Sequence, residues 1–149
     1  MKLDALVQWY EQLTPNNLPE IALLYQEGAT FRDPFNEVCG HSDIEAIFRH
    51  MFKTTQHPRF AVVDRQVDGN IAWLRWMFDC SLHGRQINIE GASRLIFGED
   101  GRVVEHCDYW DATDLFLQLP LLGTMVHFLK KRLSVPASSL GGESDINER

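Results

Sequence analysis

The sequence predicts an α+β domain in which N-terminal helices cover one face of a curved antiparallel sheet. Three observations lead to this fold class. Up to about residue 54, apolar residues recur at three- and four-residue intervals, which is typical of amphipathic helices. From residue 59 to residue 111 the period changes to two, which is typical of strands with one buried face. Glycine-containing turns separate the strand segments, so consecutive strands are expected to pair antiparallel. Helices first and strands later, within 149 residues, indicate one layered α+β domain.

Three helices are expected before the sheet. The first covers residues 2–13, where these apolar side chains share one face: Leu3, Leu6, Val7, Tyr10 and Leu13. Asn17 is placed to cap a second helix, which ends at Gly28. A Ser-x-x-Glu capping box starts the third helix at Ser42, and that helix runs to about residue 54.

A short strand between the second and third helices ends at an Asp-Pro corner. Thr30 and Phe31 favour extended backbone. Pro34 cannot continue a strand ladder, and it biases Asp33 away from helical geometry. The sequence therefore predicts a carboxylate held at the end of a strand, followed by a loop over residues 35–41.

Four strand-like segments follow the third helix: 59–68, 70–83, 85–98 and 102–111. In the second of them, one apolar row alternates with a mixed row; the first row is Leu74, Trp76, Phe78 and Cys80, and the second is Trp73, Arg75 and Met77. The helices can cover only one of these faces. We expect Trp73 and Arg75 to line the pocket, and the apolar row to form a homodimer interface, because an exposed stripe of this size usually marks an interface.

The last part of the chain differs in composition from the rest. The expected divisions are a domain over 2–120, a C-terminal helical extension over 121–133 and a disordered tail over 134–149. Residues 115–133 combine a very apolar stretch, interrupted by Pro120 and Gly123, with a basic end. This segment is expected to pack on the sheet or a second subunit, or to make a weak contact with a membrane or a partner protein.

Composition excludes several classes of function. The net charge of −7 and the pI near 5.3 argue against nucleic acid as a partner, because phosphate binding needs clustered Lys and Arg. Three cysteines without Cys-x-x-Cys spacing indicate neither a disulfide framework nor a zinc site. No metal, nucleotide or flavin is implied, since the glycine patterns that bind phosphate do not occur. The N-terminal segment lacks the apolar core of a signal peptide, so a cytoplasmic location is expected.

The order of these elements resembles the nuclear transport factor 2-like superfamily over roughly residues 2–120. That superfamily includes ketosteroid isomerase, the SnoaL-like polyketide cyclases and limonene epoxide hydrolase. The resemblance implies a cone-shaped, curved antiparallel sheet wrapped around the N-terminal helices, also called a cystatin-like roll. Such pockets host many chemistries, so the resemblance is specific for the fold and weak for the activity.

Ketosteroid isomerase suggests roles for three positions. The run Val7-Gln8-Trp9-Tyr10 looks like its first helix, where a tyrosine donates a hydrogen bond to the substrate oxyanion. The run Phe31-Arg32-Asp33-Pro34 looks like its strand bearing the general base. Its second oxyanion donor would fall near Ser93. The resemblance thus implies Asp33 as the base, with Tyr10 and Ser93 as hydrogen-bond donors.

Limonene epoxide hydrolase suggests a different carboxylate. The run His106-Cys107-Asp108-Tyr109-Trp110-Asp111 is similar to its last strand, which carries a catalytic aspartate, and its arginine would fall on Arg75. An arginine in so apolar a strand needs a carboxylate partner if it is buried, and Asp108 is the candidate. Two interpretations of this pair stay open: it orients a ligand, or it is a structural ion pair.

These observations define one candidate site. The candidate catalytic residues are Asp33, Tyr10 and Asp108, and the candidate ligand-binding residues are Phe31, Phe48, Trp73, Arg75, Ser93 and Trp110. Two roles for Asp33 are equally open: a base in an apolar pocket, or a cap that binds the backbone amides of its own corner. The expected ligand is small and mostly apolar, with one or two oxygens.

Two functions from different classes follow. The first is a cofactor-free isomerase, cyclase or hydrolase that acts on a carbonyl or epoxide compound through carboxylate general-base catalysis. The second is a non-catalytic small-ligand-binding or protein-assembly module. The module predicts the same pocket, but with Asp33 and Asp108 fully engaged by backbone amides or by Arg75, leaving no free base.

Overall fold

The computed structural model describes residues 1–119 and residue 127 of the chain. Met1–Leu115 forms a compact unit. The elements are α1 (Leu3–Glu11), a 3-10 turn η1 (Leu18–Glu20), α2 (Ile21–Leu24), β1 (Tyr25–Arg32), β2 (Glu37–Cys39), α3 (His41–Thr54), β3 (Gln56–Asp68), β4 (Ile71–Leu82), β5 (Arg85–Phe97), β6 (Val103–Trp110) and α4 (Ala112–Leu117). Within this part of the chain, no helix is long and apolar enough to cross a membrane. The predicted extension and tail lie outside the described residues, apart from His127.

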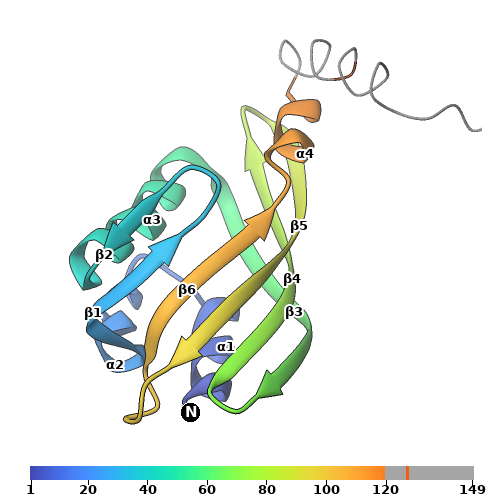
Figure 1. Cartoon of the computed structure of the whole chain (residues 1–149). Coiled ribbons are helices and arrows are strands. Elements are labelled where there is room, and N and C mark those ends of the chain that lie inside the picture. Colours follow the sequence, from blue (N-terminus) through green and yellow to red (C-terminus); the bar gives the residue numbers. More distant parts are fainter. Residues whose placement is uncertain (120–126, 128–149) are drawn as a thin grey trace, which may run out of the picture. The chain divides into compact units, whose positions relative to one another are not determined.

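A single curved sheet with the order β2-β1-β6-β5-β4-β3 forms the centre of the unit (Figure 1). Strands β3 to β6 pair antiparallel in chain order, which confirms the predicted meander and the α+β class. Strand β1 runs parallel to β6, with Phe31 opposite His106. Parallel strands end at the same edge of a sheet. The corner after β1, with Asp33, therefore lies at the same end of the sheet as Asp108.

The helices cover the face of the sheet that carries the apolar row of β4. Helix α1 contacts β3, and α3 contacts both β1 and β3. The side chains of Leu74, Trp76, Phe78 and Cys80 are all buried in the resulting core, whereas Trp73 is 42% exposed on the other face. The predicted assignment of the two faces was therefore wrong. Periodicity of two shows that faces alternate, but not which one is inside.

This inversion removes the argument for a dimer interface on the apolar row. The row is covered by the chain's own helices, so it cannot also form a subunit interface. On the outer face Arg75 pairs with Asp64 and Glu90, at 2.9 and 2.8 Å. The predicted pairing of Arg75 with Asp108 was wrong, because the two side chains lie on opposite faces of the sheet. Homodimerisation itself stays a prediction.

The second helix is much shorter than predicted. After η1, helix α2 ends at Leu24, and β1 starts at Tyr25 instead of beyond Gly28. Tyr25 pairs with Val103 of β6, and its side chain is completely buried. The pairing with β6 thus overrides the local helix pattern, as tertiary contacts commonly do.

The predicted loop over residues 35–41 contains a short strand, β2, that the sequence did not predict. The backbone turns at Asp33, whose N–H donates to the carbonyl of Asn36 at 2.9 Å, and β2 then returns along β1. Helix α3 begins at His41, with Gly40 at its N-cap position at φ 93°, and no side chain caps it. The predicted capping box is therefore not formed, because the N-cap position is Gly40, two residues before Ser42, and glycine readily adopts this positive φ.

Candidate active site

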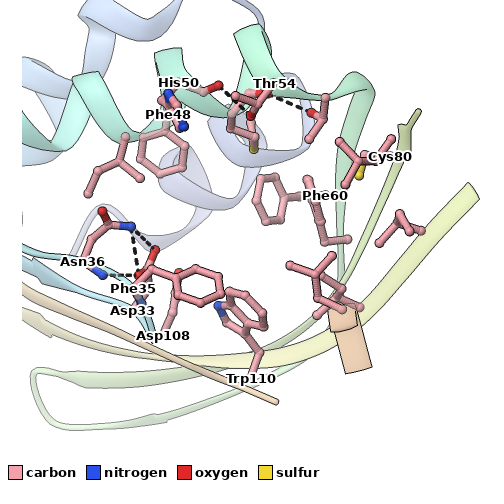
Figure 2. A pocket seen from close by; sticks show the side chains of 18 of the residues that line it. Asp33, Phe35, Asn36, Phe48, His50, Thr54, Phe60, Cys80, Asp108 and Trp110 are labelled. Carbon is pink, nitrogen blue, oxygen red and sulfur yellow. Dashed lines mark hydrogen bonds between the residues drawn. The ribbon is translucent and has the colours of Figure 1, made fainter. Parts of the chain in front are cut away.

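A pocket of about 350 Å³ opens between α3 and the sheet (Figure 2). The apolar part of its lining comes from β1, α3, β3, β4, β5, β6, α4 and the turn after β1: Phe31, Phe35, Ile47, Phe48, Met51, Phe60, Trp76, Phe78, Leu82, Ile87, Ile89, Trp110 and Leu115. The polar part is small: Asp33, Asn36, His50, Thr54, Thr55, Cys80 and Asp108. A concave, largely apolar site with a few polar groups suits a small organic ligand. Among the described residues, no three His, Cys, Asp or Glu side chains are grouped to hold a metal ion.

Asp108 on β6 is held in place through one of its two oxygens. The Ser93 hydroxyl donates to Oδ1 at 2.5 Å, and His106 Nε2 lies 2.6 Å from the same oxygen. Ser93 is the cross-strand neighbour of Asp108, and His106 is two residues earlier on the same face of β6. Within residues 1–119, Oδ2 takes no hydrogen bond. The Asp108 side chain is 16% exposed, and the residue belongs to the lining of the pocket.

The Ser93 hydroxyl is in turn held by Trp76. The Trp76 indole N–H donates to Ser93 Oγ at 2.8 Å. Gly91 lies opposite Trp76 in the β4–β5 ladder, and a Cβ at Gly91 would come within 2.3 Å of the indole ring. Because glycine has no Cβ, it leaves room for the Trp76 ring to lie across β5 at this point. Gly91 therefore positions Trp76, Trp76 positions Ser93, and Ser93 positions Asp108.

The other nitrogen of His106 contacts two buried tyrosines. Nδ1 lies 2.9 Å from the Tyr10 hydroxyl and 2.7 Å from the Tyr25 hydroxyl, and these two hydroxyls also hydrogen-bond each other. Burial raises the pKa of Tyr10 and of Tyr25 well above the usual value, with the negative charge of Asp108 adding to the effect. Both tyrosines are thus neutral donors. Each phenol has one proton to donate, so one hydroxyl donates to the other while the second donates to Nδ1, and Nε2–H of His106 donates to Asp108.

A second, much smaller cavity of about 20 Å³ lies among these polar groups. Its lining includes Tyr10, Ser93, His106 and Asp108, and it shares Phe48, Phe60, Trp76 and Asp108 with the larger pocket. A cavity of this volume with several polar partners is large enough for one water molecule. Asp108 therefore borders both the apolar pocket and a polar recess.

Asp33 also lines the pocket, but its carboxylate caps its own corner. Oδ1 accepts from the backbone N–H groups of Phe35 and Asn36, each at 2.7 Å, and the Asn36 side-chain amide lies 3.0 Å from both oxygens (Figure 2). This is the corner-cap geometry, one of the two roles that the sequence left open. Of the two aspartates, Asp108 is the one with an oxygen that takes no hydrogen bond from a described residue.

The other sequence-predicted residues divide into three groups. Phe31, Phe48 and Trp110 line the large pocket. Tyr10 and Ser93 do not line it; they line the small recess and act through His106 and Asp108. Trp73 and Arg75 belong to neither cavity, since they lie on the outer face, where Trp73 stacks on Tyr109 with ring centroids 5.8 Å apart. Their predicted contact with ligand was wrong.

His106 is the functional residue that the sequence analysis did not select. It is 2% exposed and joins the tyrosine pair to Asp108. The signal was present in the sequence, because His106 and Asp108 alternate on one face of a strand that is otherwise rich in apolar residues. A polar pair on a buried strand face has to be hydrogen-bonded, and this points to a network.

Fold and site together define a class of protein: a curved sheet and covering helices that border a largely apolar pocket with two aspartates in its lining. Residues 6–106 match the SnoaL-like domain family, so the chain belongs to that family. No curated protein matches the sequence.

Solved structures share the fold at low sequence identity. A Burkholderia pseudomallei nuclear transport factor 2-like protein of unknown function is 17% identical, with 78% of this chain and 95% of that chain covered and a TM-score of 0.69. A Catenulispora acidiphila protein with a ketosteroid isomerase-like fold, in complex with trimethylamine, is 14% identical, with 79% and 92% covered and a TM-score of 0.68. An LEH-like epoxide hydrolase of M. tuberculosis is 14% identical, with 87% and 92% covered and a TM-score of 0.64. These similarities establish the fold alone.

Proposed function

We propose that this protein is an enzyme in which Asp108 acts as a general base on a small, mostly apolar carbonyl or epoxide compound, without a cofactor. One observation carries the proposal. Oδ1 of Asp108 accepts from Ser93 and His106, while Oδ2 takes no hydrogen bond from any described residue, and Asp108 belongs to the lining of the pocket. One oxygen is thus fixed and the other is left for a substrate proton.

The chemistry follows from this geometry. With a carbonyl substrate, Asp108 Oδ2 takes a proton from the carbon next to the carbonyl, and the electron pair of the C–H bond moves to the carbonyl oxygen. Return of that proton to another carbon gives an isomer. Attack of the enolate carbon on a second carbonyl carbon gives a ring, as the C=O π bond breaks and its oxygen takes the proton back from Asp108. With an epoxide, Asp108 takes a proton from water while the water oxygen attacks a ring carbon; the C–O bond at that carbon breaks, and the alkoxide oxygen takes the proton, which gives a diol. A positioned general base contributes about 10²–10⁴-fold in such steps.

The hydrogen-bond network supports the base role by fixing its orientation. Ser93 and His106 hold the carboxylate plane, and Trp76 holds Ser93. Tyr10 and Tyr25 keep His106 in the tautomer that donates to Asp108. These hydrogen bonds fix the orientation of the carboxylate relative to the pocket.

The test is a comparison of the wild type with Asp108→Asn on a panel of aryl ketones, 1,3-dicarbonyl compounds and epoxides. Asparagine keeps an oxygen for Ser93 and His106 but cannot take the proton, so we expect kcat to fall by about 10²-fold or more. Asp64→Asn is the matched control, because it removes the same charge from the outer face, where Asp64 pairs with Arg75. Equal activity of Asp108→Asn and wild type would remove Asp108 from the chemistry.

A non-catalytic binding module is the second candidate, and the geometry of Asp33 favours it. That carboxylate accepts hydrogen bonds on both oxygens from its own corner, as a module with no free base requires. The engagement of Asp108 through Oδ1 alone favours the enzyme instead. Ligand binding without turnover of any compound in the panel would support the module.

A further inference from the structure

The charge of the pocket lining is one-sided. Among the residues that the structure describes, two aspartates line the pocket, and no lysine or arginine does. The donors that reach these carboxylates are backbone amides, the Asn36 amide, a hydroxyl and an imidazole. Arg32 directly precedes Asp33, but its guanidinium lies against Cys107 Sγ, at 3.2 and 3.3 Å. Within the described part of the chain, both aspartates therefore border this cavity, and no guanidinium or ammonium group belongs to its lining.

The mouth of this cavity carries two aromatic rings beside one of the aspartates. Phe35 and Trp110 make an edge-to-face contact with ring centroids 5.3 Å apart, and both line the pocket together with Asp33 (Figure 2). Phe35 is 57% exposed although it is large and apolar. Oδ2 of Asp33 accepts only the Asn36 amide within the described residues, so it retains capacity for a ligand.

An apolar ligand that fills the cavity strips water from both carboxylates. A neutral ligand leaves their charges without compensation, and an anionic ligand adds repulsion. A positively charged ligand offsets the charge, and its cation is attracted to the faces of aromatic rings. The ammonium of an apolar amine is the simplest group that meets both conditions.

We propose that the pocket takes an apolar ligand that carries an ammonium group, and that this group binds at the mouth between Phe35, Trp110 and Asp33. Asp33 then serves as the counter-charge, and Asp108 remains the base at the floor. The assignment of a substrate class rests on the proposed function, whereas the binding preference stands on the lining residues alone.

Three non-reacting probes of similar size separate the effect of charge from the effect of shape. Benzyltrimethylammonium is the cation, neopentylbenzene is its uncharged carbon isostere, and phenylacetate is an anion. We expect the cation to bind the full-length protein at least about tenfold more tightly than the isostere, from cation–π attraction and one partly desolvated counter-charge. Phenylacetate should not bind measurably. Dissociation constants come from tryptophan fluorescence or protein-observed NMR titrations.

Two variants locate the cation. Asp33→Asn keeps the oxygen that caps the corner and removes the charge, so we expect the ratio of cation to isostere affinity to fall several-fold. Asp64→Asn, which removes an equal charge from the outer face, should leave the ratio unchanged. Trp110→Leu should weaken cation binding more than isostere binding.

Several outcomes would overturn the proposal. They are equal or tighter binding of the isostere, an equal effect of Asp33→Asn and Asp64→Asn, and no binding of either probe at millimolar concentration. All of these are binding measurements, so they can refute the ammonium proposal without refuting the role of Asp108 as a base. Turnover of neutral ketones that is lost in Asp108→Asn would support the proposed function even if no ammonium preference exists.

Discussion

Replacement of Gly91 by alanine tests whether the support of Asp108 is built as the structure indicates. A Cβ at Gly91 would lie 2.3, 2.4 and 2.8 Å from three carbon atoms of the Trp76 ring, so the ring has to move. Trp76 is 6% exposed and packs edge-to-face on Phe60 at 5.7 Å. The ring also lines the ligand pocket, so a displaced indole reduces that space.

Two terms set the expected loss in the free energy of unfolding. Overpacking of a core site costs about 1–3 kcal/mol. Displacement of the indole also breaks its hydrogen bond to Ser93, which adds about 1 kcal/mol. We therefore expect Gly91→Ala to lower the free energy of unfolding by about 2–4 kcal/mol, measured by urea denaturation followed by tryptophan fluorescence.

Gly28→Ala is the matched control for this measurement. Gly28 also lies in a strand, but a Cβ there would meet no atom within 4 Å. Its replacement should leave stability unchanged or raise it slightly, because alanine restricts the unfolded chain more than glycine does. If Gly91→Ala and Gly28→Ala had the same midpoint, the crowding of Trp76 against β5 would not exist, and the inferred positioning of Ser93 would fail with it.

Three further predictions concern the network and the surface. The pKa values of Tyr10 and Tyr25 are raised, so the folded protein keeps both phenols protonated at a pH where the unfolded chain ionises them. The contribution of each tyrosine to stability is therefore fully present below about pH 10. Above that pH, the free energy of unfolding should fall by about 1.4 kcal/mol per pH unit for each tyrosine. Tyr25→Phe should flatten the decline of denaturation midpoints between pH 9 and 11 relative to the wild type; an unchanged slope would contradict the burial of its hydroxyl. Arg75→Ala should leave ligand affinity and turnover unchanged in titrations and rate assays, because its partners are on the outer face. Asp33→Ala should cost about 1–3 kcal/mol in urea denaturation while Asp33→Asn costs less, because only asparagine keeps the oxygen that the backbone amides need.

Local chemistry was sufficient to predict the meander. Its turns contain glycine, and the period of two is sustained, so the predicted segments 59–68 and 85–98 agree closely with β3 at Gln56–Asp68 and β5 at Arg85–Phe97. Which face of β4 is buried could not be predicted from the sequence in the same way. Both rows of that strand contain large apolar residues, and Arg75 finds its carboxylates on neighbouring strands rather than in the core.

The two carboxylates of the site show a second limit of reading the sequence. Asp33 and Asp108 both lie near the C-terminal end of a strand among aromatic residues. What distinguishes them is the set of donors around each one. For Asp33 the donors come from the next three residues, so the cap was foreseeable as one of two roles. For Asp108 the decisive donor Ser93 comes from the neighbouring strand, and its role depends on the β5–β6 register.

The role of His106 depends on a helix boundary in a distant part of the chain. If the second helix ran to Gly28, Tyr25 would lie on a helix rather than at the start of β1. As β1 begins at Tyr25, that residue pairs with β6, and its hydroxyl reaches His106 at 2.7 Å. Tyr10 arrives from α1 and completes the contact with the same nitrogen. The tautomer of His106, and with it the hydrogen bond that orients Asp108, thus follows from where a short helix ends. A variant that extends α2 by one turn should therefore reduce turnover through Asp108 while leaving the apolar pocket able to bind its ligand.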